Sequence, residues 1–346
     1  MKKKFDRKIS ILFYTFGNRE IGFGHLFRCI SLANFFLKQN YLFSFDFIID
    51  NNQTDISILK EFADFRFNIY KKIPKSKKNK WNICIVDKLN EKILNLNKLK
   101  KLTDILVTID NKYINDQVDV SFFPLYKPKK KILYGSDYQI LNPNFLNERK
   151  IRNKIRKKKS GSLSLFISQG GSDAHNLLYK ITFFLMNEFY ELNNIKFYVL
   201  LSSKYNSKEK NLFYLLKKKR PKKLFCIYKE KNLAKTMNKM DLAISSGGIT
   251  ACELMYLNIP TLLISKEKKE LETMSFLSKK KLCINIGYFN QRNIKNLKKK
   301  IKELINNRSK RESLQKNCNN FFRINSSNQV CKIILNKFIK RKGLNE

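Results

Sequence analysis

The chain of 346 residues is 43% hydrophobic and carries 71 lysines and arginines against 28 aspartates and glutamates, a formal net charge of +43. Its length predicts two domains, and its apolar content excludes an intrinsically disordered protein. The charge permits anionic partners, but lysine is abundant together with Asn, Ile and Phe, so we interpret most lysines as solvated surface residues.

The remaining composition narrows the class of protein further. The lysine clusters lack the interleaved aromatic residues that stack single-stranded bases, so no specific nucleic acid is expected as a partner. Seven scattered cysteines and two histidines show no metal-ligand pattern, so we expect free, buried thiols in a reducing compartment and neither a metal nor a cofactor.

The N-terminus, MKKKFDRKISILFYTF, resembles a signal peptide only superficially, because its apolar run is short and no small-residue cleavage site follows. We interpret it as a first strand. No run of about 18 apolar residues occurs, so no transmembrane segment is predicted. We expect a cytoplasmic monomer, for which a weak attraction to anionic membrane surfaces stays open.

In the first half, short strand-like apolar runs alternate with longer segments of helical periodicity. Strands are predicted at 9–16, 43–49, 83–87 and 105–110, and helices at 25–38, 54–65 and 89–101. Such alternation predicts an α/β fold built on an open, mostly parallel sheet.

The best domain boundary follows a basic helical stretch, residues 144–159, that runs into Ser160-Gly161-Ser162. We therefore divide the chain into a domain of residues 1–158 and a domain of residues 159–346. In the second domain, strands are predicted at 163–168, 196–202, 224–228, 241–246 and 261–265, helices at 174–190 and 249–257, and a mostly helical tail at 289–341. The two halves share no residue-level repeat, but each contains a strand, then glycines, then a helix.

Three loops, residues 16–25, 168–176 and 245–250, hold seven of the eleven glycines. Each loop follows a strand and opens a helix, which is where parallel sheets place ligands and where free N–H groups suit phosphate. One such loop could be an ordinary turn, but three favour a phosphate-bearing ligand. The loops lack the complete dinucleotide fingerprint and the P-loop motif. The candidate ligand contacts are Gly22, Gly24, Gly170, Gly171, Gly247 and Gly248.

Polar side chains at two of these helix starts each have two interpretations. Thr250 and Glu253 have the spacing of a capping box, which would close the start of the helix. In the second interpretation, Glu253 accepts hydrogen bonds from the ribose hydroxyls of a nucleotide. Ser172 and Asp173 are helix caps first, and diphosphate or sugar contacts second.

The first loop leads into His25, with Arg28 one helical turn later on the same face. A histidine can exchange a proton near neutral pH, so His25 is a candidate acid or base, although a local hydrogen bond at the helix start would also explain it. Arg28 could hold a diphosphate or a carboxylate, or extend toward solvent.

These motifs resemble a known family. IGFGHLFRCISLA (21–33) is similar to the G-x-G-H-x-x-R-x-x-x-LA segment of the UDP-sugar hydrolases of pseudaminic acid biosynthesis and of their relatives in spore-coat and flagellin-glycan biosynthesis. QGGSDAHN (169–176), DLAISSGGITACELMYLNIPTLLI (241–264) and LYGSDYQILNPNF (133–145) resemble further segments of these proteins, in the same order.

The resemblance implies a GT-B type of fold, in which two Rossmann-like domains face each other across a cleft. It implies that the C-terminal domain binds UDP and that the N-terminal domain holds the sugar and the catalytic loop. It also implies hydrolysis of a UDP-linked 2,4-diacetamido-2,4,6-trideoxy hexose at the anomeric C–O bond, which releases UDP and free sugar for nonulosonic acid biosynthesis. His25 would orient or deprotonate the water, and Asp87, at the end of the strand predicted at 83–87, would belong to the substrate-binding set.

Several positions depart from the family pattern. Asn142 and Asn144 replace an arginine and a glutamate, and the stretch SKEKKELE (265–272) lacks the usual Asn-Gln pair. These changes motivate a second hypothesis, a UDP-sugar-dependent GT-B glycosyltransferase in which a sugar or lipid hydroxyl replaces water. A third hypothesis, a polyanion-binding protein, rests only on the net charge.

Overall fold

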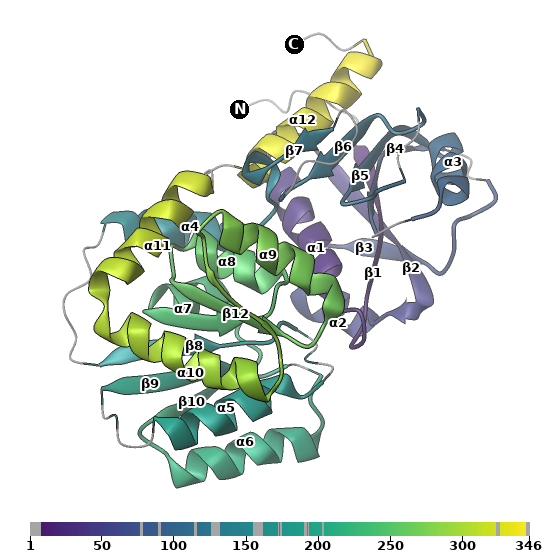
Figure 1. Cartoon of the computed structure of the whole chain (residues 1–346). Coiled ribbons are helices and arrows are strands. Elements are labelled where there is room, and N and C mark those ends of the chain that lie inside the picture. The colour runs from purple at the N-terminus through teal and green to yellow at the C-terminus, as the bar shows by residue number, and fades with distance from the viewer. Residues whose placement is uncertain are drawn as a thin grey trace. The chain divides into compact units, whose positions relative to one another are not determined.

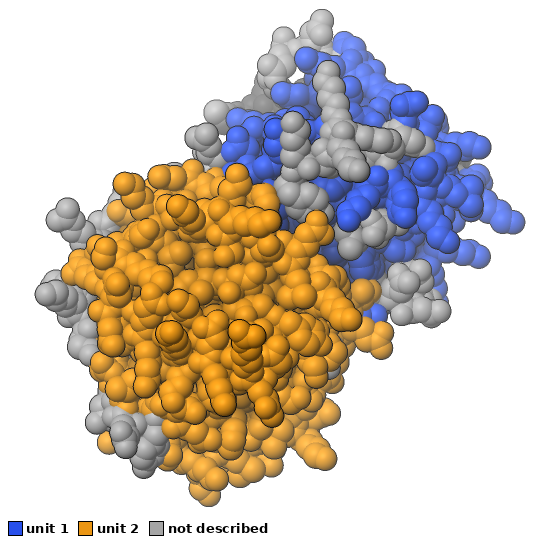
Figure 2. Space-filling view, viewed as in Figure 1, with its two compact units in different colours: residues 1–18, 25–143, 323–346 blue, residues 19–24, 144–322 orange. Residues whose placement is uncertain are grey.

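The computed structural model describes residues 8–76, 79–88, 91–113, 116–125, 132–154, 162–171, 173, 175–189, 192, 194–202, 204–322 and 326–343. The chain divides into two compact units, which Figure 2 shows in different colours. Unit 1 comprises residues 1–18, 25–143 and 323–346, and unit 2 comprises residues 19–24 and 144–322.

Unit 1 is built around a seven-stranded sheet (Figure 1). Its strands are β1 (Ile9–Gly17), β2 (Phe43–Thr54), β3 (Phe67–Tyr70), β4 (Trp81–Asp87), β5 (Thr103–Ile109), β6 (Val120–Phe123) and β7 (Leu133–Tyr134). Its helices are α1 (Gly24–Phe36), α2 (Ile56–Phe62), α3 (Ile93–Lys101), the short η1 (Ser136–Tyr138) and the C-terminal α12 (Ser326–Arg341).

The central strands of unit 1 form because their apolar runs are buried on both faces, as is usual for parallel sheets. Phe13 of β1 and Phe47 of β2 stack with their ring centroids 5.0 Å apart. Trp81 is completely buried, and its indole N–H donates to the Asp46 carboxylate at 2.6 Å. That bond satisfies the one polar group that the ring carries into the core.

Unit 2 contains a six-stranded sheet. Its strands are β8 (Leu163–Ile167), β9 (Ile195–Leu200), β10 (Leu224–Ile227), β11 (Leu242–Ser245), β12 (Thr261–Ser265) and β13 (Ile284–Tyr288). Its helices are α4 (Pro143–Lys154), α5 (Leu177–Glu188), α6 (Ser207–Lys219), α7 (Leu233–Asn238), α8 (Ile249–Tyr256), η2 (Lys268–Glu270), α9 (Leu271–Lys279), α10 (Gln291–Asn306) and α11 (Arg308–Phe321). One continuous core joins its sheet to α5, α6, α10 and α11.

The two sheets have the same strand order over their first six strands, although the two halves of the sequence share no residue-level repeat. Every strand pairing is parallel, and the orders are β3-β2-β1-β4-β5-β6-β7 and β10-β9-β8-β11-β12-β13. In each sheet the first strand lies between the second and the fourth, so the chain reverses its direction of winding there. That switch point is where open α/β sheets bind ligands. The mostly parallel α/β sheets predicted from the sequence are confirmed.

The observed division differs from the predicted boundary at 158/159. Helix α4 groups with unit 2 from Asn144 onward, because its arginines bond to carbonyl groups there. Arg149 donates to the Asn319 carbonyl at 3.1 Å, and Arg152 donates to the Asn238 carbonyl at 2.6 Å. Residues 155–161, which include most of the predicted linker, lie outside the described residues.

The last helix also changes the predicted division, because α12 groups with unit 1. It buries Val330, Cys331, Ile334, Leu335 and Phe338. At its start the Ser326 hydroxyl donates to the Gln139 carbonyl at 2.7 Å, and the Leu141 N–H donates to the Ser327 hydroxyl at 2.9 Å. The chain therefore returns to its first unit at the C-terminus.

Other features extend the sequence analysis. Strands β3, β6, β7 and β13 and helices α6, α7 and α9 were not predicted, because most of these segments are short or lysine-rich. All seven cysteines are free, and six of them are buried. No helix among the described residues is long and apolar enough to span a membrane.

Candidate functional site

The switch point of unit 1 gathers four ionisable side chains. Strand β1 pairs with β4 so that Thr15 lies beside Asp87, the last residue of β4. The next residues of the chain after β1 form the first glycine loop, and α1 then carries His25 and Arg28. Asp110 follows the end of β5, the neighbour of β4. Residues far apart in sequence therefore meet at one edge of the sheet.

His25 and Asp87 form a hydrogen-bonded pair. The His25 Nδ1 lies 2.7 Å from Asp87 Oδ1, and the imidazole stacks on Phe16 with centroids 4.8 Å apart. Because an ionised carboxylate only accepts hydrogen bonds, this contact requires a proton on Nδ1. In the neutral ring, Nε2 then carries the lone pair. The pair therefore presents a base at Nε2, with its tautomer set by the carboxylate behind it.

Arg28 is held by carboxylates through all three guanidinium nitrogens. Its Nε donates to Asp87 Oδ2 at 2.6 Å, Nη2 donates to Asp87 Oδ1, and Nη1 donates to Asp110 Oδ2 at 2.6 Å. The side chain is almost completely buried, and the paired carboxylates raise its pKa although burial opposes them. Arg28 was predicted to hold a diphosphate or a carboxylate, or to extend toward solvent. In the structure it holds two carboxylates, those of Asp87 and Asp110.

Asp87, which the resemblance places among the substrate-binding residues, bonds to other protein side chains. Its carboxylate is completely buried and is committed to His25 and Arg28. Burial alone would raise its pKa, but the charges of Arg28 and His25 outweigh burial and hold the pKa below its ordinary value. Asp87 therefore stays ionised, and both of its carboxylate oxygens bond to side chains of α1.

The switch point of unit 2 brings the glycine loops together. The second loop leaves β8 and the third leaves the adjacent β11, and residues 19–24 of the first loop group with this unit. A methyl group added at Gly171 would lie 3.1 Å from the Phe23 ring, and one added at Gly24 would lie 3.1 Å from the Ile249 side chain. Gly22, Gly24, Gly170, Gly171, Gly247 and Gly248 therefore belong to one set of packed loops.

Glu270, which was not predicted, closes the third loop. The Gly247 N–H donates to its carboxylate at 3.1 Å, and the hydroxyls of Ser246 and Ser265 donate at 3.2 and 2.6 Å. A Cβ at Gly247 would lie 2.9 Å from the Glu270 carbonyl oxygen and 2.8 Å from Met274 Cγ. Glycine at 247 is therefore required by the close approach of η2 and α9.

Asp173 acts as a helix cap, the first of its two predicted roles. Its carboxylate accepts from the N–H groups of Leu177 and Leu178, at 2.8 and 3.2 Å, and from the Tyr205 hydroxyl. Burial raises its pKa to about 6. The neighbouring His175 lies 2.9 Å from Glu267 through Nε2. Ser172, predicted beside them, lies outside the described residues.

The capping-box interpretation of Thr250 and Glu253 is wrong. Helix α8 begins at Ile249, and Gly248 occupies the cap position without a side-chain bond, so Thr250 already lies inside the helix. Glu253 starts the second turn and is partly buried, which raises its pKa to about 7. No hydrogen bond from a described residue to its carboxyl group is recorded, which leaves that group available to a ligand.

Two further polar groups at this switch point have no partner among the described residues. Gln169 Nε2, in the second loop, and Ser245 Oγ, at the end of β11, are buried without a hydrogen bond to any described residue. A buried polar group without a partner is uncommon and is often completed by water or a ligand. Neither residue was predicted as a ligand contact, although both lie within the predicted glycine loops.

The predicted residues therefore fall into two sets. His25, Arg28 and Asp87 meet in unit 1, where Asp110 joins them. The glycines, Thr250 and Glu253 lie at the switch point of unit 2, together with the unpredicted Glu270. The missed residues gave weak signals: Asp110 ends an apolar strand, whereas Glu270 lies in a lysine-rich stretch.

Comparisons with known proteins agree with this architecture. Residues 165–330 match the glycosyltransferase family 28 C-terminal domain. The uncharacterized protein MJ1062 of Methanocaldococcus jannaschii is 29% identical over 286 residues, or 77% of this chain. The matched stretch spans only 57% of that relative.

Several solved structures share the fold over nearly the whole chain. MurG of Acinetobacter baumannii has a TM-score of 0.63 at 13% identity, covering 95% of this chain and 99% of that one. MnaA of S. aureus, solved with UDP, has a TM-score of 0.59 at 12% identity, covering 98% of both chains. The UDP-GlcNAc 2-epimerase of M. jannaschii has a TM-score of 0.55 at 13% identity, covering 95% and 100%. The predicted GT-B class of fold is confirmed.

Proposed function

We propose that this protein hydrolyses a UDP-linked amino sugar at its anomeric C–O bond. The observation that carries the proposal is the pair of His25 and Asp87, which presents a base at the helix that follows the first glycine loop. Its second support is the group of three glycine loops at a switch point, the usual place for a phosphate-bearing ligand in this fold class.

The loops of unit 2 suit a nucleoside diphosphate. The N–H groups of the first residues of α8 are donors without a side-chain cap from Gly248, whereas the preceding Gly247 N–H already donates to the Glu270 carboxylate. The diphosphate would bind there, and the Glu253 carboxylate would accept hydrogen bonds from the ribose hydroxyls. The unpaired groups of Gln169 and Ser245 give further donors and acceptors. The match of residues 165–330 to a glycosyltransferase domain supports this assignment.

His25 would carry out the proton transfer. Nε2 takes a proton from water, whose oxygen forms the new bond to the anomeric carbon. The bond from that carbon to the β-phosphate oxygen breaks, and UDP leaves with the electron pair. Asp87 keeps the proton on Nδ1 and stabilises the imidazolium that forms. The sugar class, a 2,4-diacetamido-2,4,6-trideoxy hexose, rests on the resemblance of residues 21–33 and 241–264.

The second histidine provides a matched control for this role. The wild-type chain, His25→Asn and His175→Asn are incubated with the UDP-linked 2,4-diacetamido-trideoxy hexose, and UDP and free sugar are measured. Loss of the base should lower the rate by about 10²- to 10⁴-fold. His175, in the second glycine loop, is bonded to the partly exposed Glu267, so its replacement should leave the rate at saturating substrate unchanged and affect at most the affinity for the UDP-sugar. Full activity of His25→Asn would refute the mechanism.

The glycosyltransferase match favours one alternative, in which the same base deprotonates an acceptor hydroxyl instead of water. The same assay distinguishes the two reactions. Rapid release of free sugar without an acceptor supports hydrolysis. Release of UDP only after a sugar or lipid acceptor is added, with the sugar recovered on that acceptor, supports transfer.

A further inference from the structure

One helix of unit 2 exposes an unusual number of apolar side chains. Among the described residues of this unit, six large hydrophobic side chains are exposed, and three of them lie on α6: Leu212, Tyr214 and Leu215, at 38, 64 and 49%. Phe183 and Tyr228, at 46 and 40%, lie on neighbouring segments. We call these five residues the α6 surface. Figure 1 shows α6 on the outside of unit 2, next to α5.

The burial pattern of α6 shows that the exposed apolar residues lie on the outer side of the helix, away from its buried residues. Phe213 and Leu216 are buried and fix the inner face. With 3.6 residues per turn, Tyr214, Leu215 and Leu212 then lie on the outer arc, interleaved with Lys208, Lys218 and Lys219. The outer face therefore alternates apolar and cationic side chains, rather than being uniformly polar.

Contacts with both neighbours place the flanking aromatic residues beside α6. Tyr179 of α5 stacks on Phe183 at 6.0 Å and meets Phe213 of α6 edge-on at 5.5 Å. On the other side, the Lys210 ammonium lies 4.5 Å from the Tyr228 ring and donates to its hydroxyl at 3.0 Å.

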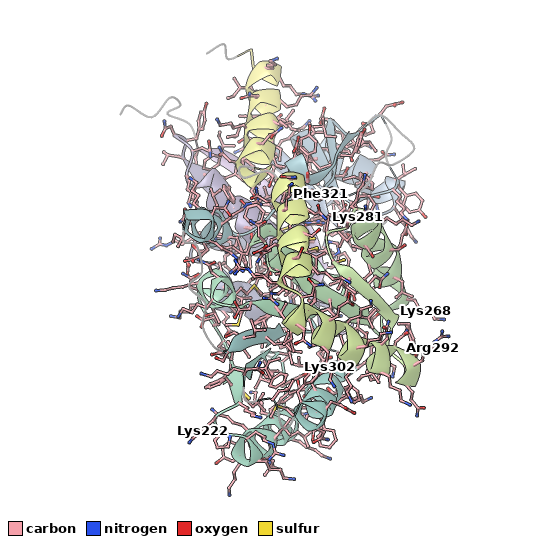
Figure 3. The ribbon with its side chains drawn as sticks, turned by 60° about the vertical axis from the view of Figure 1, so that its left-hand side comes forward. Lys222, Lys268, Lys281, Arg292, Lys302 and Phe321 are labelled. Carbon is pink, nitrogen blue, oxygen red and sulfur yellow. The ribbon has the colours of Figure 1, made fainter. Side chains whose placement is uncertain are left out.

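The charge around α6 has one sign. Residues 207–223 contain eight lysines and arginines and a single acidic residue, Glu209. Glu209 is itself paired with Arg19 and bonded to the Asn206 N–H. Figure 3 shows Lys222, at the end of this segment, extending outward from the ribbon. A partner that covers the α6 surface must therefore be anionic as well as apolar.

We propose that the α6 surface docks this protein peripherally on an anionic lipid bilayer. Lysines reach phosphate headgroups while Leu212, Tyr214 and Leu215 enter the boundary between headgroups and acyl chains. No described helix is long and apolar enough to cross a bilayer, so this contact lies at the interface. The proposal does not depend on the proposed activity.

The test measures co-sedimentation of the full chain with vesicles of phosphatidylcholine alone or mixed with phosphatidylglycerol. Binding is expected to the mixed vesicles and to weaken with salt. Leu212→Ser with Leu215→Ser should weaken it about 100-fold or more, because two leucine side chains lose their burial in lipid. The control, Ile93→Ser with Leu94→Ser, removes an equally exposed aliphatic pair from α3 and should bind as the wild type does.

A second pair of variants separates local from general charge. Lys218→Gln with Lys219→Gln should weaken binding by about 10- to 30-fold, from about fivefold for each lysine at the surface. Lys281→Gln with Lys302→Gln, which removes two exposed lysines elsewhere in unit 2, should change it much less (Figure 3). Equal effects of the two pairs would overturn the proposal, because only the net charge would then matter.

Two other results would also overturn it. One is wild-type vesicle binding by Leu212→Ser with Leu215→Ser. The other is a change in sedimentation coefficient caused by that variant without lipid, which would show an interface between copies of the chain. Because both leucines are exposed, circular dichroism and the melting temperature should stay as in the wild type and confirm that the variant folds.

Discussion

The two switch points share a topology and differ in chemistry. In unit 1 the strand ends carry His25, Arg28, Asp87 and Asp110, whose charged groups bond to one another. In unit 2 the strand ends carry glycines, hydroxyls and the carboxyl group of Glu253, and several polar groups there have no described partner. One arrangement of parallel strands therefore supports both an internally satisfied charge network and a set of groups open to a ligand.

The difference between paired charges in unit 1 and unpaired polar groups in unit 2 indicates different roles for the two sites. Buried charges are tolerated only when they are paired, and the charged groups of unit 1 pair with one another and hold the imidazole in one orientation. Unpaired buried groups are unfavourable, so a polar ligand that bonded to those of unit 2 would be favoured. Breaking the first should damage both folding and catalysis, whereas altering the second should mainly affect ligand binding.

The largest effect is expected from Asp87→Asn. The variant leaves Arg28 without its bidentate carboxylate and removes the acceptor that keeps the proton on His25 Nδ1. Activity should fall by about three to four orders of magnitude. Stability in urea unfolding at pH 7 should fall by about 3–5 kcal/mol, as for other broken buried pairs.

The pH dependence of this loss follows from the lowered pKa of Asp87. Its contribution to stability is present above the ordinary value of 3.8 and disappears as pH falls through the folded value, so the variant and the wild type should converge only in acid. Glu312→Gln is the control, because that exposed carboxylate pairs with Arg308 one turn away and should contribute less than about 1 kcal/mol. Unchanged activity in Asp87→Asn would show that His25 and Asp87 do not act as a catalytic pair.

An intermediate effect is expected in unit 2 from Gly247→Ala. The new Cβ would lie within 2.8–2.9 Å of Met274 and of the Glu270 backbone, so η2 and α9 must move. The variant should lose about 1–3 kcal/mol of stability and bind UDP more weakly. Gly248→Ala, whose Cβ would lie 3.4 Å from Glu270 Oε1 and 3.8 Å from Ser246 Oγ, both ordinary van der Waals distances, should fold with nearly wild-type stability. Equal melting temperatures for the two variants would show that the close approach does not constrain the loop.

The smallest effect concerns Glu253 and the pH dependence of ligand binding. Burial raises its pKa to about 7, so the carboxyl group is protonated below that pH and becomes a stronger acceptor for ribose hydroxyls above it. Calorimetry with a UDP-sugar in a His25→Asn background should show affinity rising about tenfold between pH 6 and 8. Glu253→Gln should bind more weakly and without this dependence.

Protein stability should change in the opposite direction. The folded pKa of Glu253 lies above its ordinary value of 4.5, so the folded state binds more protons between these two values. The wild type should therefore lose stability as pH rises through this window, and Glu253→Gln should lose less. An affinity for the UDP-sugar that does not change with pH would argue against a contact between Glu253 and the ribose.

Much of the fold could be predicted because the signals are local. The apolar runs at 9–16, 83–87 and 163–168 correspond to β1, β4 and β8, since a strand buried on both faces needs continuous hydrophobic residues. The start of α8 was harder to predict from the sequence. Thr250 and Glu253 have the spacing of a capping box, but that spacing does not show at which residue the helix begins. The N-cap at Gly248 is visible only in three dimensions.

The sequence by itself determined that glycine loops follow strands and open helices, and that His25 and Arg28 share one face of a helix. These relations depend on spacing along the chain. Only the tertiary structure decided what those groups contact. Asp87 reaches Arg28 across 59 positions and Asp110 reaches it across 82, while Glu270 bonds to Gly247 across 23. The physical reason is that strand order brings chain-distant ends together, and strand order is set by packing of the whole sheet rather than by any local pattern.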